Sequence, residues 1–279
     1  IKLPLIMNLK WYHYLLITMI ILILIISSLY LYSGNWPPLT IIESDSMQHG
    51  SQFTWFALNT GDIVVVKKIS NYSDIVTYVQ GRLENYVSYG DYGDVIIYYS
   101  NYKEPPIIHR AMLYLEWSGK NFTFPGERNA EQQGWVIIKG YNIIILNVGP
   151  SQRNLIINVS MYIGQNGYIT MGDNNLINSY RSNPNVIFPE VAYYAADQNI
   201  GISLHPVKLN DIEGKAVGWI PWFGAFRILL SGQSYYIKMI PVETYYYLGF
   251  VISLTIAIGY IVDYIYYGNE KDDKNGRKN

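Results

Sequence analysis

The sequence predicts a mostly β domain with one apolar helix at each end. Two apolar segments, near the start and the end of the chain, are long enough to cross a bilayer. The region between them consists of short runs rich in β-branched and aromatic residues, including many of the 28 tyrosines. It shows no helical periodicity of useful length. We therefore expect an all-β domain that is attached at both ends.

The first apolar segment, Tyr14 to Tyr32, contains no charged residue. Its length is close to the roughly 20 residues that a membrane-spanning helix requires. A cleaved signal peptide is the alternative. It is disfavoured because the apolar run exceeds a usual signal-peptide core and no A-x-A cleavage site follows it. We predict an uncleaved membrane anchor.

The second apolar segment, Tyr245 to Tyr267, is interrupted only by Asp263 near its end. Tyrosines crowd both of its edges, as they do in the aromatic belt of a membrane span. A buried helix of a soluble protein is the alternative, and the length of the run disfavours it. We predict a second membrane-spanning helix here.

The Lys and Arg residues outside the two spans predict the orientation of the chain. Lys2 and Lys10 precede the first span, and the second is followed by Lys271, Lys274, Arg277 and Lys278. Both ends are then cytoplasmic, and the domain lies on the exterior face of the cell membrane. The expected parts are an N-terminal tail and anchor (1–33), an exterior β-rich domain (34–240), a C-terminal transmembrane helix (241–267) and a cytoplasmic tail (268–279).

Composition excludes several classes of function. The net charge of −1 implies no basic face for nucleic acid. The absence of cysteine removes disulfides, thiol catalysis and thiolate metal sites. We expect neither a metal nor another cofactor. With 50% hydrophobic and only 15% charged residues, an exterior domain of this kind must be stabilised by its core.

The strands are predicted from short β-rich runs bounded by Gly, Asn, Pro or Ser. The sequence KGYN at 139–142 interrupts one run as a hairpin turn would. In chain order, the predicted strands are 61–69, 92–100, 105–117, 134–148 and 154–163.

Of the four histidines, His109 differs from the others because it lies within an apolar strand pattern, IIHRAM, and is followed by Arg110. A single strand histidine is more often structural than catalytic. Its companions change that interpretation. In order along the chain stand Ser44-Asp45-Ser46-Met47, Gly61-Asp62, His109-Arg110, Gly172-Asp173-Asn174-Asn175 and Gly214-Lys215-Ala216 with Gly218 to Pro221.

This series resembles the type I signal peptidase family in its archaeal and endoplasmic-reticulum branch. That branch has an S-x-S-M-x-P box, a G-D strand start, H-R, G-D-N-N, a further Asp and a G-[KR]-A-x-G-x-x-P strand. Each piece alone is weak, but five in this order beside a membrane anchor are a strong signal. The resemblance covers a minor fraction of the chain, and it implies a signal-peptidase-like β fold.

The resemblance implies that Ser46 is a nucleophile and His109 its general base, where the bacterial branch has lysine. A serine hydroxyl needs a base within about 2.6–3.2 Å to become a good nucleophile. Ser44 matches the family's serine that helps to hold the oxyanion, with the Ser46 N–H as the other donor.

The acidic residue departs from the family pattern. The second carboxylate that normally follows GDNN is missing, because Asn178 or Ser179 stands there. Ala196-Asp197-Gln198 comes later, at nearly the family's spacing before Gly214. The economical interpretation is an insertion of roughly 176–195. We expect Asp197 to orient His109 and Asp173 to support it, with Asp173 as the alternative triad acid.

Two further departures concern the serine box and the segment after His109. His49 replaces the family's proline and is an alternative base, although so close to Ser46 on a turn we expect it to point elsewhere. The long segment 110–172 is expected to hold an extra hairpin, within 134–163.

The expected function is a membrane-bound serine endopeptidase that removes signal peptides from exported precursor proteins. An extended precursor segment would align beside an active-site strand. The protein translocation channel is a further expected partner. Candidate walls of shallow apolar pockets, with core packing as the alternative, are Ile41, Ile42, Met47 and Ile107. The alternative function is a non-catalytic membrane-tethered β-domain that acts in envelope or pilus assembly.

Overall fold

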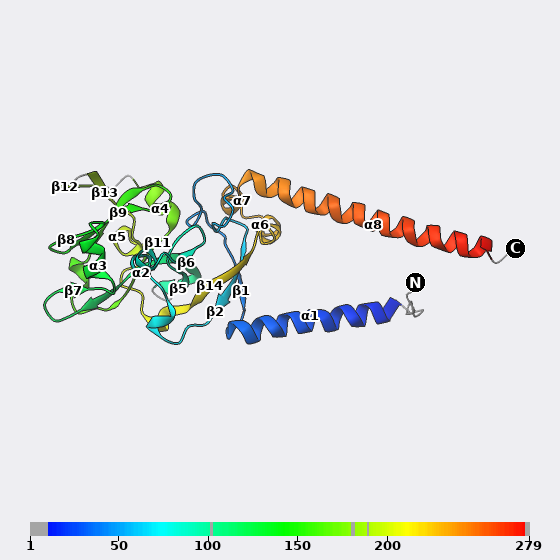
Figure 1. Ribbon diagram of the computed structural model, residues 1–279, viewed down its shortest axis with the longest axis horizontal. Helices are drawn as coiled ribbons and strands as arrows, with labels where there is room; N and C mark the ends of the chain where they lie inside the picture. The colour runs from blue at the N-terminus through cyan, green and yellow to red at the C-terminus, as the bar shows by residue number, and fades with distance from the viewer. Residues whose placement is uncertain (1–10, 101–102, 180–181, 189, 277–279) are drawn as a thin grey trace.

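The computed structural model describes residues 11–100, 103–179, 182–188 and 190–276. Two long helices, α1 (Trp11–Ser33) and α8 (Val242–Gly276), leave the same end of a mostly β domain (Figure 1). The predicted class, a mostly β chain with an apolar helix at each end, is confirmed. Residues Tyr12–Ser33 and Val242–Tyr264 are long and apolar enough to cross a membrane. At most 6% of either apolar window is buried, which disfavours a soluble core helix.

The first sheet has seven antiparallel strands and carries the candidate site. Its order is β1-β2-β14-β5-β6-β11, and β7 pairs with the far end of β6. β14 is last in the chain but lies between β2 and β5, so it joins the two halves of the sheet. The strands are β1 (Leu39–Ile41), β2 (Ile63–Lys67), β5 (Val95–Ser100), β6 (Lys103–Trp117), β7 (Phe122–Thr123), β11 (Gly167–Met171) and β14 (Ile212–Ile220).

The second sheet lies at the end of the domain away from α1 and α8 (Figure 1). Its five strands are ordered β12-β13-β10-β9-β8. β8 (Val136–Lys139) and β9 (Asn142–Val148) form a hairpin, with Gly140 at a positive φ of 58°, as the sequence predicted. The remaining strands are β10 (Arg153–Asn158), β12 (Ser182–Phe188) and β13 (Glu190–Tyr194), and β3 (Val87–Ser88) pairs separately with β4 (Asp91–Tyr92).

The segment interpreted as an insertion, 176–195, forms the edge of this second sheet. It contains β12 and β13, and β13 pairs in parallel with β10. β13 ends at Tyr194, so the chain reaches Asp197 directly from a strand that β10 holds in place. The pairing of β13 with β10 therefore helps to determine where Asp197 lies.

The prediction of an all-β domain is wrong in detail, because short helices lie between the strands. Each has only four to seven residues, too few to show a 3.6-residue periodicity in the sequence. The helices are α2 (Tyr78–Glu84), α3 (Glu127–Gln132), α4 (Asp173–Ile177), α5 (Asp197–Ile200), α6 (Ala225–Ser231) and α7 (Ser234–Ile237), with 3₁₀ turns at Tyr72–Asp74, Ser160–Tyr162 and Leu209–Asp211.

The core is divided between the two sheets. The larger cluster joins β6 to the second sheet through residues such as Leu113, Ile145 and Leu155. A second cluster packs behind β2 and β5 and contains Met47 and Leu58 from the segment before β2. That segment is therefore fixed to the sheet by burial of its own apolar side chains, which stabilises it by roughly 25 cal/mol per Å².

Candidate active site

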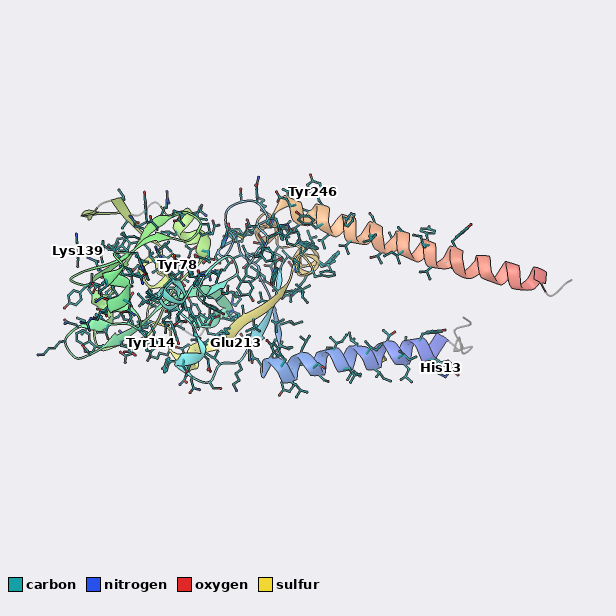
Figure 2. The ribbon with its side chains drawn as sticks, viewed as in Figure 1. His13, Tyr78, Tyr114, Lys139, Glu213 and Tyr246 are labelled. Atoms are coloured by element: carbon teal, nitrogen blue, oxygen red, sulfur yellow. The ribbon has the colours of Figure 1, made fainter. Side chains whose placement is uncertain are left out.

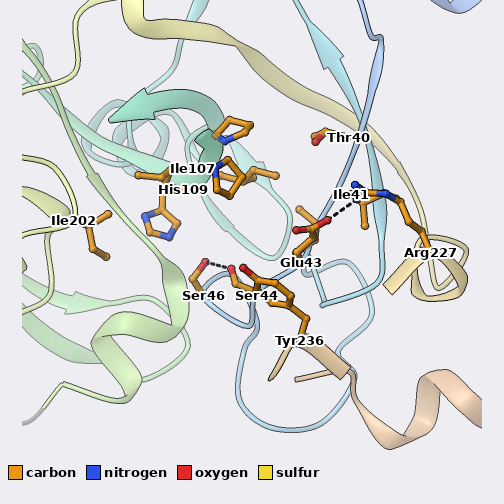
Figure 3. A pocket seen from close by; sticks show the side chains of 14 residues that line it. Thr40, Ile41, Glu43, Ser44, Ser46, Ile107, His109, Ile202, Arg227 and Tyr236 are labelled. Carbon is orange, nitrogen blue, oxygen red and sulfur yellow. Dashed lines mark hydrogen bonds and ion pairs between the residues drawn. The ribbon is translucent and has the colours of Figure 1, made fainter. Parts of the chain in front are cut away.

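A cleft of about 460 Å³ opens at the end of the domain nearest the two long helices (Figure 3). One wall is the segment from β1 to Ser46, and another is the start of β6 up to His109. Arg227 from α6, Tyr236 from α7 and Ile202 after α5 complete it. The cleft thus joins residues from the whole length of the domain, including the motif residues Ser44, Ser46 and His109.

His109 lies on β6 and is held by a buried carboxylate. Its Nδ1 is 2.7 Å from Oδ2 of Asp197, and both side chains are almost completely shielded from solvent. The hydroxyl of Tyr98, on the neighbouring strand β5, also donates to this Oδ2, at 2.8 Å. Burial and then the charge of Asp197 raise the pKa of Tyr98 far above its usual value, so Tyr98 remains a donor. A carboxylate only accepts, so Nδ1 carries the proton and Nε2 of neutral His109 is free to accept one.

Gly172 lies next to both Nε2 of His109 and the main-chain carbonyl of Ser46. A methyl group on Gly172 would lie 2.9 Å from Nε2 and 2.7 Å from the Ser46 carbonyl oxygen. Only glycine fits between them without displacement. In Figure 3 the His109 ring and the Ser46 side chain both lie beside the cleft, and the Ser46 hydroxyl is hydrogen-bonded to Ser44 Oγ, at 3.0 Å. Catalytic hydrogen bonds are often long or poorly aligned before substrate binds, so this arrangement is compatible with a serine–histidine pair.

Ser44 and the main chain of Ser46 offer two hydrogen-bond donors beside the cleft. The two hydroxyl oxygens are 3.0 Å apart and both face the cleft. Among the described residues, no acceptor is found for the Ser46 N–H. A side-chain hydroxyl and a main-chain N–H are the types of donor that stabilise the tetrahedral intermediate of acyl transfer.

Asp173 does not contact His109. Its carboxylate receives two hydrogen bonds from Arg110, from Nε at 2.9 Å and from Nη2 at 2.7 Å, and lies 3.0 Å from Nε2 of His49. Burial raises the pKa of Asp173, but the charge and hydrogen bonds of Arg110 lower it more, to about 2. Of the two candidate acids, Asp197 is therefore the one in contact with His109. His49 points toward Asp173, so it is turned away from Ser46 as expected.

The Arg110 guanidinium lies at the centre of a buried charge cluster. Besides Asp173, its Nη1 donates to the main-chain carbonyls of Ser88, Asp91, Tyr92 and Gly93. Burial and then the charge of Asp173 raise the pKa of Asp91 to about 6. Since Arg110 follows His109 on β6, this cluster fixes the strand that carries the histidine against the loop that carries Ser46.

The loop of residues 43–50, called the serine loop below, is held from two sides. Asn174 donates its N–H to the Ser46 carbonyl at 2.9 Å and its Nδ2 to the Asp45 carbonyl at 3.0 Å. From the other side, Nε2 of buried Gln48 donates to Thr60 Oγ1 at 2.7 Å and to the Met239 carbonyl at 2.9 Å. The GDNN motif is therefore more than a turn, because its first Asn fixes the serine loop.

Three of the four predicted pocket residues line the cleft: Ile41, Ile42 and Ile107. Met47 does not, and this prediction is wrong. Its side chain is buried in the core with Leu58 and Val64, because the tight turn from Asp45 to Gln48 directs it away from the cleft. Burial in the core was the alternative.

Sequence reasoning missed several residues of the site. Tyr98 lies in an apolar strand run and carries no signal in the sequence. Ile202, Arg227 and Tyr236 come from segments that match no motif and enter the cleft only through the fold. Among the described residues, no group of three or more histidine or acidic side chains is placed to hold a metal ion.

Comparison with known protein families finds no family model that matches this chain, and no curated protein has a significantly similar sequence. Function is therefore inferred from the motifs and from the geometry of the cleft.

Proposed function

We propose that this protein is a membrane-anchored serine endopeptidase, similar to type I signal peptidases, that removes signal peptides from exported precursors. The observation that carries the proposal is the arrangement of His109. Its Nδ1 is bound to buried Asp197, and its Nε2 meets the Ser46 main chain at Gly172, beside a cleft. A histidine oriented by a carboxylate beside a serine is the arrangement of serine hydrolases on many folds.

In the proposed reaction, Nε2 of His109 takes the proton of the Ser46 hydroxyl as Oγ attacks the scissile carbonyl carbon. The oxyanion that forms accepts hydrogen bonds from the Ser44 hydroxyl and the Ser46 N–H. The imidazolium of His109 then protonates the departing amine, which leaves an acyl group on Ser46. Water, deprotonated by His109, hydrolyses this ester and restores the serine.

The edge of the first sheet suits an extended substrate. β1 is the terminal strand in the sheet order and, among the described residues, pairs only with β2. Thr40, Ile41 and Ile42 of this segment line the cleft. A precursor segment that paired with the outer edge of β1 would present alternate side chains to the apolar wall formed with Ile107. Shallow apolar walls favour small residues of the A-x-A type.

The proposed topology places both termini in the cytoplasm and residues 34–240 outside, as the Lys and Arg flanks predict. Protease added to intact cells should then spare a C-terminal tag. A tag that is cleaved from outside would contradict this orientation.

A second candidate function, a non-catalytic domain in envelope or pilus assembly, is favoured by one observation. Ser46 Oγ is hydrogen-bonded to Ser44. No hydrogen bond joins it to His109 in the described part of the chain. Purified full-length protein and its Ser46→Ala variant, each incubated with a precursor that carries an A-x-A site, distinguish the two functions. The peptidase proposal expects wild-type cleavage that the variant lacks. No cleavage by the wild type would favour the non-catalytic domain, and equal cleavage by both proteins would contradict Ser46 as the nucleophile.

A further inference from the structure

The segment between β14 and α8 exposes a series of large apolar side chains. Leu230 of α6 is 88% exposed and Tyr235 of α7 is 67% exposed. The other exposed members of the series are Phe223, Phe226 and Leu229. Single exposed apolar residues are ordinary on protein surfaces, but several adjacent in sequence on one short segment mark an interaction site.

The inner face of α6 is already buried. Ala225 and Ile228 pack against Ile240, just before α8, and Leu248, within its second turn. The domain therefore already covers the inner face of α6, and its own residues do not cover the apolar side chains on the outer face. A helix that is apolar on both faces is normally buried on both, so its outer face requires an apolar environment from outside the domain.

The charge of the segment favours a lipid surface as that environment. From Gly214 to Val242 the sequence contains no acidic residue. Lys238 follows α7 and is exposed, whereas Arg227 on α6 is paired with the Glu43 carboxylate. Aromatic and aliphatic side chains beside an exposed cation, on a segment without acidic residues of its own, are typical of segments that bind the interface of an anionic bilayer.

The position of the segment supports the same occupant. α6 and α7 lie at the end of the domain from which α1 and α8 both leave (Figure 1). Tyr246 marks the start of α8 and His13 the distant end of α1 (Figure 2). Tyr246 is 71% exposed, and Trp36, shortly after α1, is 68% exposed. Aromatic residues at the ends of both helices match the interfacial belt of membrane spans. α7 ends only a few residues before the first residue of α8, so α6 and α7 lie close to the end of the second span.

We propose that α6 and α7 form a membrane-docking element that inserts Phe226, Leu230 and Tyr235 into the lipid interface. This proposal rests on the proposed membrane anchoring and is independent of peptidase activity. Arg227 and Tyr236, on the same two short helices, line the cleft with Ser46. Docking would therefore hold the cleft at the lipid surface.

Because the chain has no cysteine, a thiol-reactive fluorophore attaches only to the cysteine that each variant introduces. Three full-length variants, each carrying a small fluorophore, are reconstituted into phosphatidylcholine–phosphatidylglycerol vesicles containing a lipid with a nitroxide at a shallow or a deep position. Leu230→Cys tests the element, and Leu254→Cys reports on the middle of the α8 apolar segment. Met161→Cys is the soluble control, since this residue is 82% exposed in the 3₁₀ turn after β10.

We expect Leu230→Cys to be quenched at least twofold more by the shallow nitroxide than by the deep one. Leu254→Cys should show the reverse, and Met161→Cys neither. A quenched Leu254→Cys with an unquenched Leu230→Cys would overturn the docking element while leaving the span intact. Cross-linking of Leu230→Cys between copies, without quenching, would show that a second chain covers α6 and would also overturn it. An unquenched Leu254→Cys would instead refute the membrane anchoring.

Discussion

The Asp197 carboxylate lies 2.7 Å from Nδ1 of His109 in a completely buried position. Its Oδ2 accepts from both His109 and Tyr98, while Oδ1 has no hydrogen-bond partner in the described part of the chain. A buried carboxylate with one unpaired oxygen is costly unless a positive charge faces it. Protonation of the His109 ring would supply that charge, so in the proposed reaction Asp197 would stabilise the imidazolium that forms when Ser46 loses its proton.

Replacing Asp197 by Asn should lower kcat for precursor cleavage at least 10²-fold, with little change in KM. The amide keeps the size of the carboxylate but removes its charge, and it can donate to Nδ1, which favours the wrong tautomer. In a well-studied triad the analogous change costs about 10⁴ in kcat. Steady-state kinetics on a soluble precursor peptide measure the effect. If Asp197→Asn turns over almost normally while folded Asp173→Asn does not, Asp173 is the triad acid.

The serine and histidine should act as one unit. We expect Ser46→Ala and His109→Ala each to abolish cleavage, and the double variant to be no worse than either single variant, as for residues that share one step. His49→Ala is the matched control, because His49 contacts Asp173 and is turned away from Ser46. It should retain most of its turnover. Activity retained in His109→Ala but lost in His49→Ala would identify His49 as the base.

The Asp173–Arg110 pair should make stability depend on pH below about 4. The pKa of Asp173 is about 2 in the folded protein and 3.8 as the unperturbed reference. A lowered folded pKa contributes stability that is present above the unfolded value and is lost as pH falls through the folded value. The expected loss is on the order of 2 kcal/mol. Urea unfolding between pH 2 and 7 measures it, and Asp173→Asn should remove this step while destabilising the protein at pH 7.

Asp91 provides the control of opposite sign. Its pKa is raised from 3.8 to about 6 by burial and by the charge of Asp173. A carboxyl group with a raised folded pKa contributes stability below the unfolded value that is lost as pH rises through the folded value. Asp91→Asn should therefore flatten the fall in stability between about pH 4 and 6. If the free energy of unfolding of both Asp173→Asn and Asp91→Asn depends on pH as it does in the wild type, neither carboxyl group titrates in this way.

Periodicity and turn residues predicted the strands that carry the site. β6, with His109 and Arg110, lies where the run 105–117 placed it. The long run 134–148 splits at Gly140 into β8 and β9 as expected. The short helices were missed because one or two turns leave no period in the sequence. The predicted strand 154–163 ends at Asn158, where a 3₁₀ turn follows.

The contact between His109 and Asp197 was expected from the resemblance to type I signal peptidases, because Asp197 stands at nearly the family's spacing before Gly214. What the sequence could not predict were contacts made by residues without a motif. The cleft receives Arg227 and Tyr236 only because β14 crosses the sheet and returns the chain beside β1. Gln48 is the clearest case. Nothing in SMQHG indicates that this side chain binds a carbonyl that lies just before α8.

Gln48 should position Ser46. Its buried amide donates to Thr60 Oγ1 and to the Met239 carbonyl, so it ties the serine loop both to the sheet and to the segment entering α8. Gln48→Met keeps approximate length and removes both donors. Each buried acceptor left without a donor costs about 1–3 kcal/mol, which the loop can relieve by moving. A displacement near 1 Å lowers turnover by about 10² when it reaches the reacting groups.

We therefore expect Gln48→Met to lower kcat at least 10-fold with KM nearly unchanged, and to speed amide hydrogen exchange across the serine loop, residues 43–50. Gln52→Met is the matched control, because Gln52 is exposed a few residues away and should change neither quantity. The exchange measurement does not depend on catalysis and so tests the tether by itself. Equal exchange in Gln48→Met and wild type would show that the Met239 carbonyl does not hold the loop. Faster exchange with unchanged kcat would show that the loop moves without disturbing Ser46, and the positioning role would then be wrong.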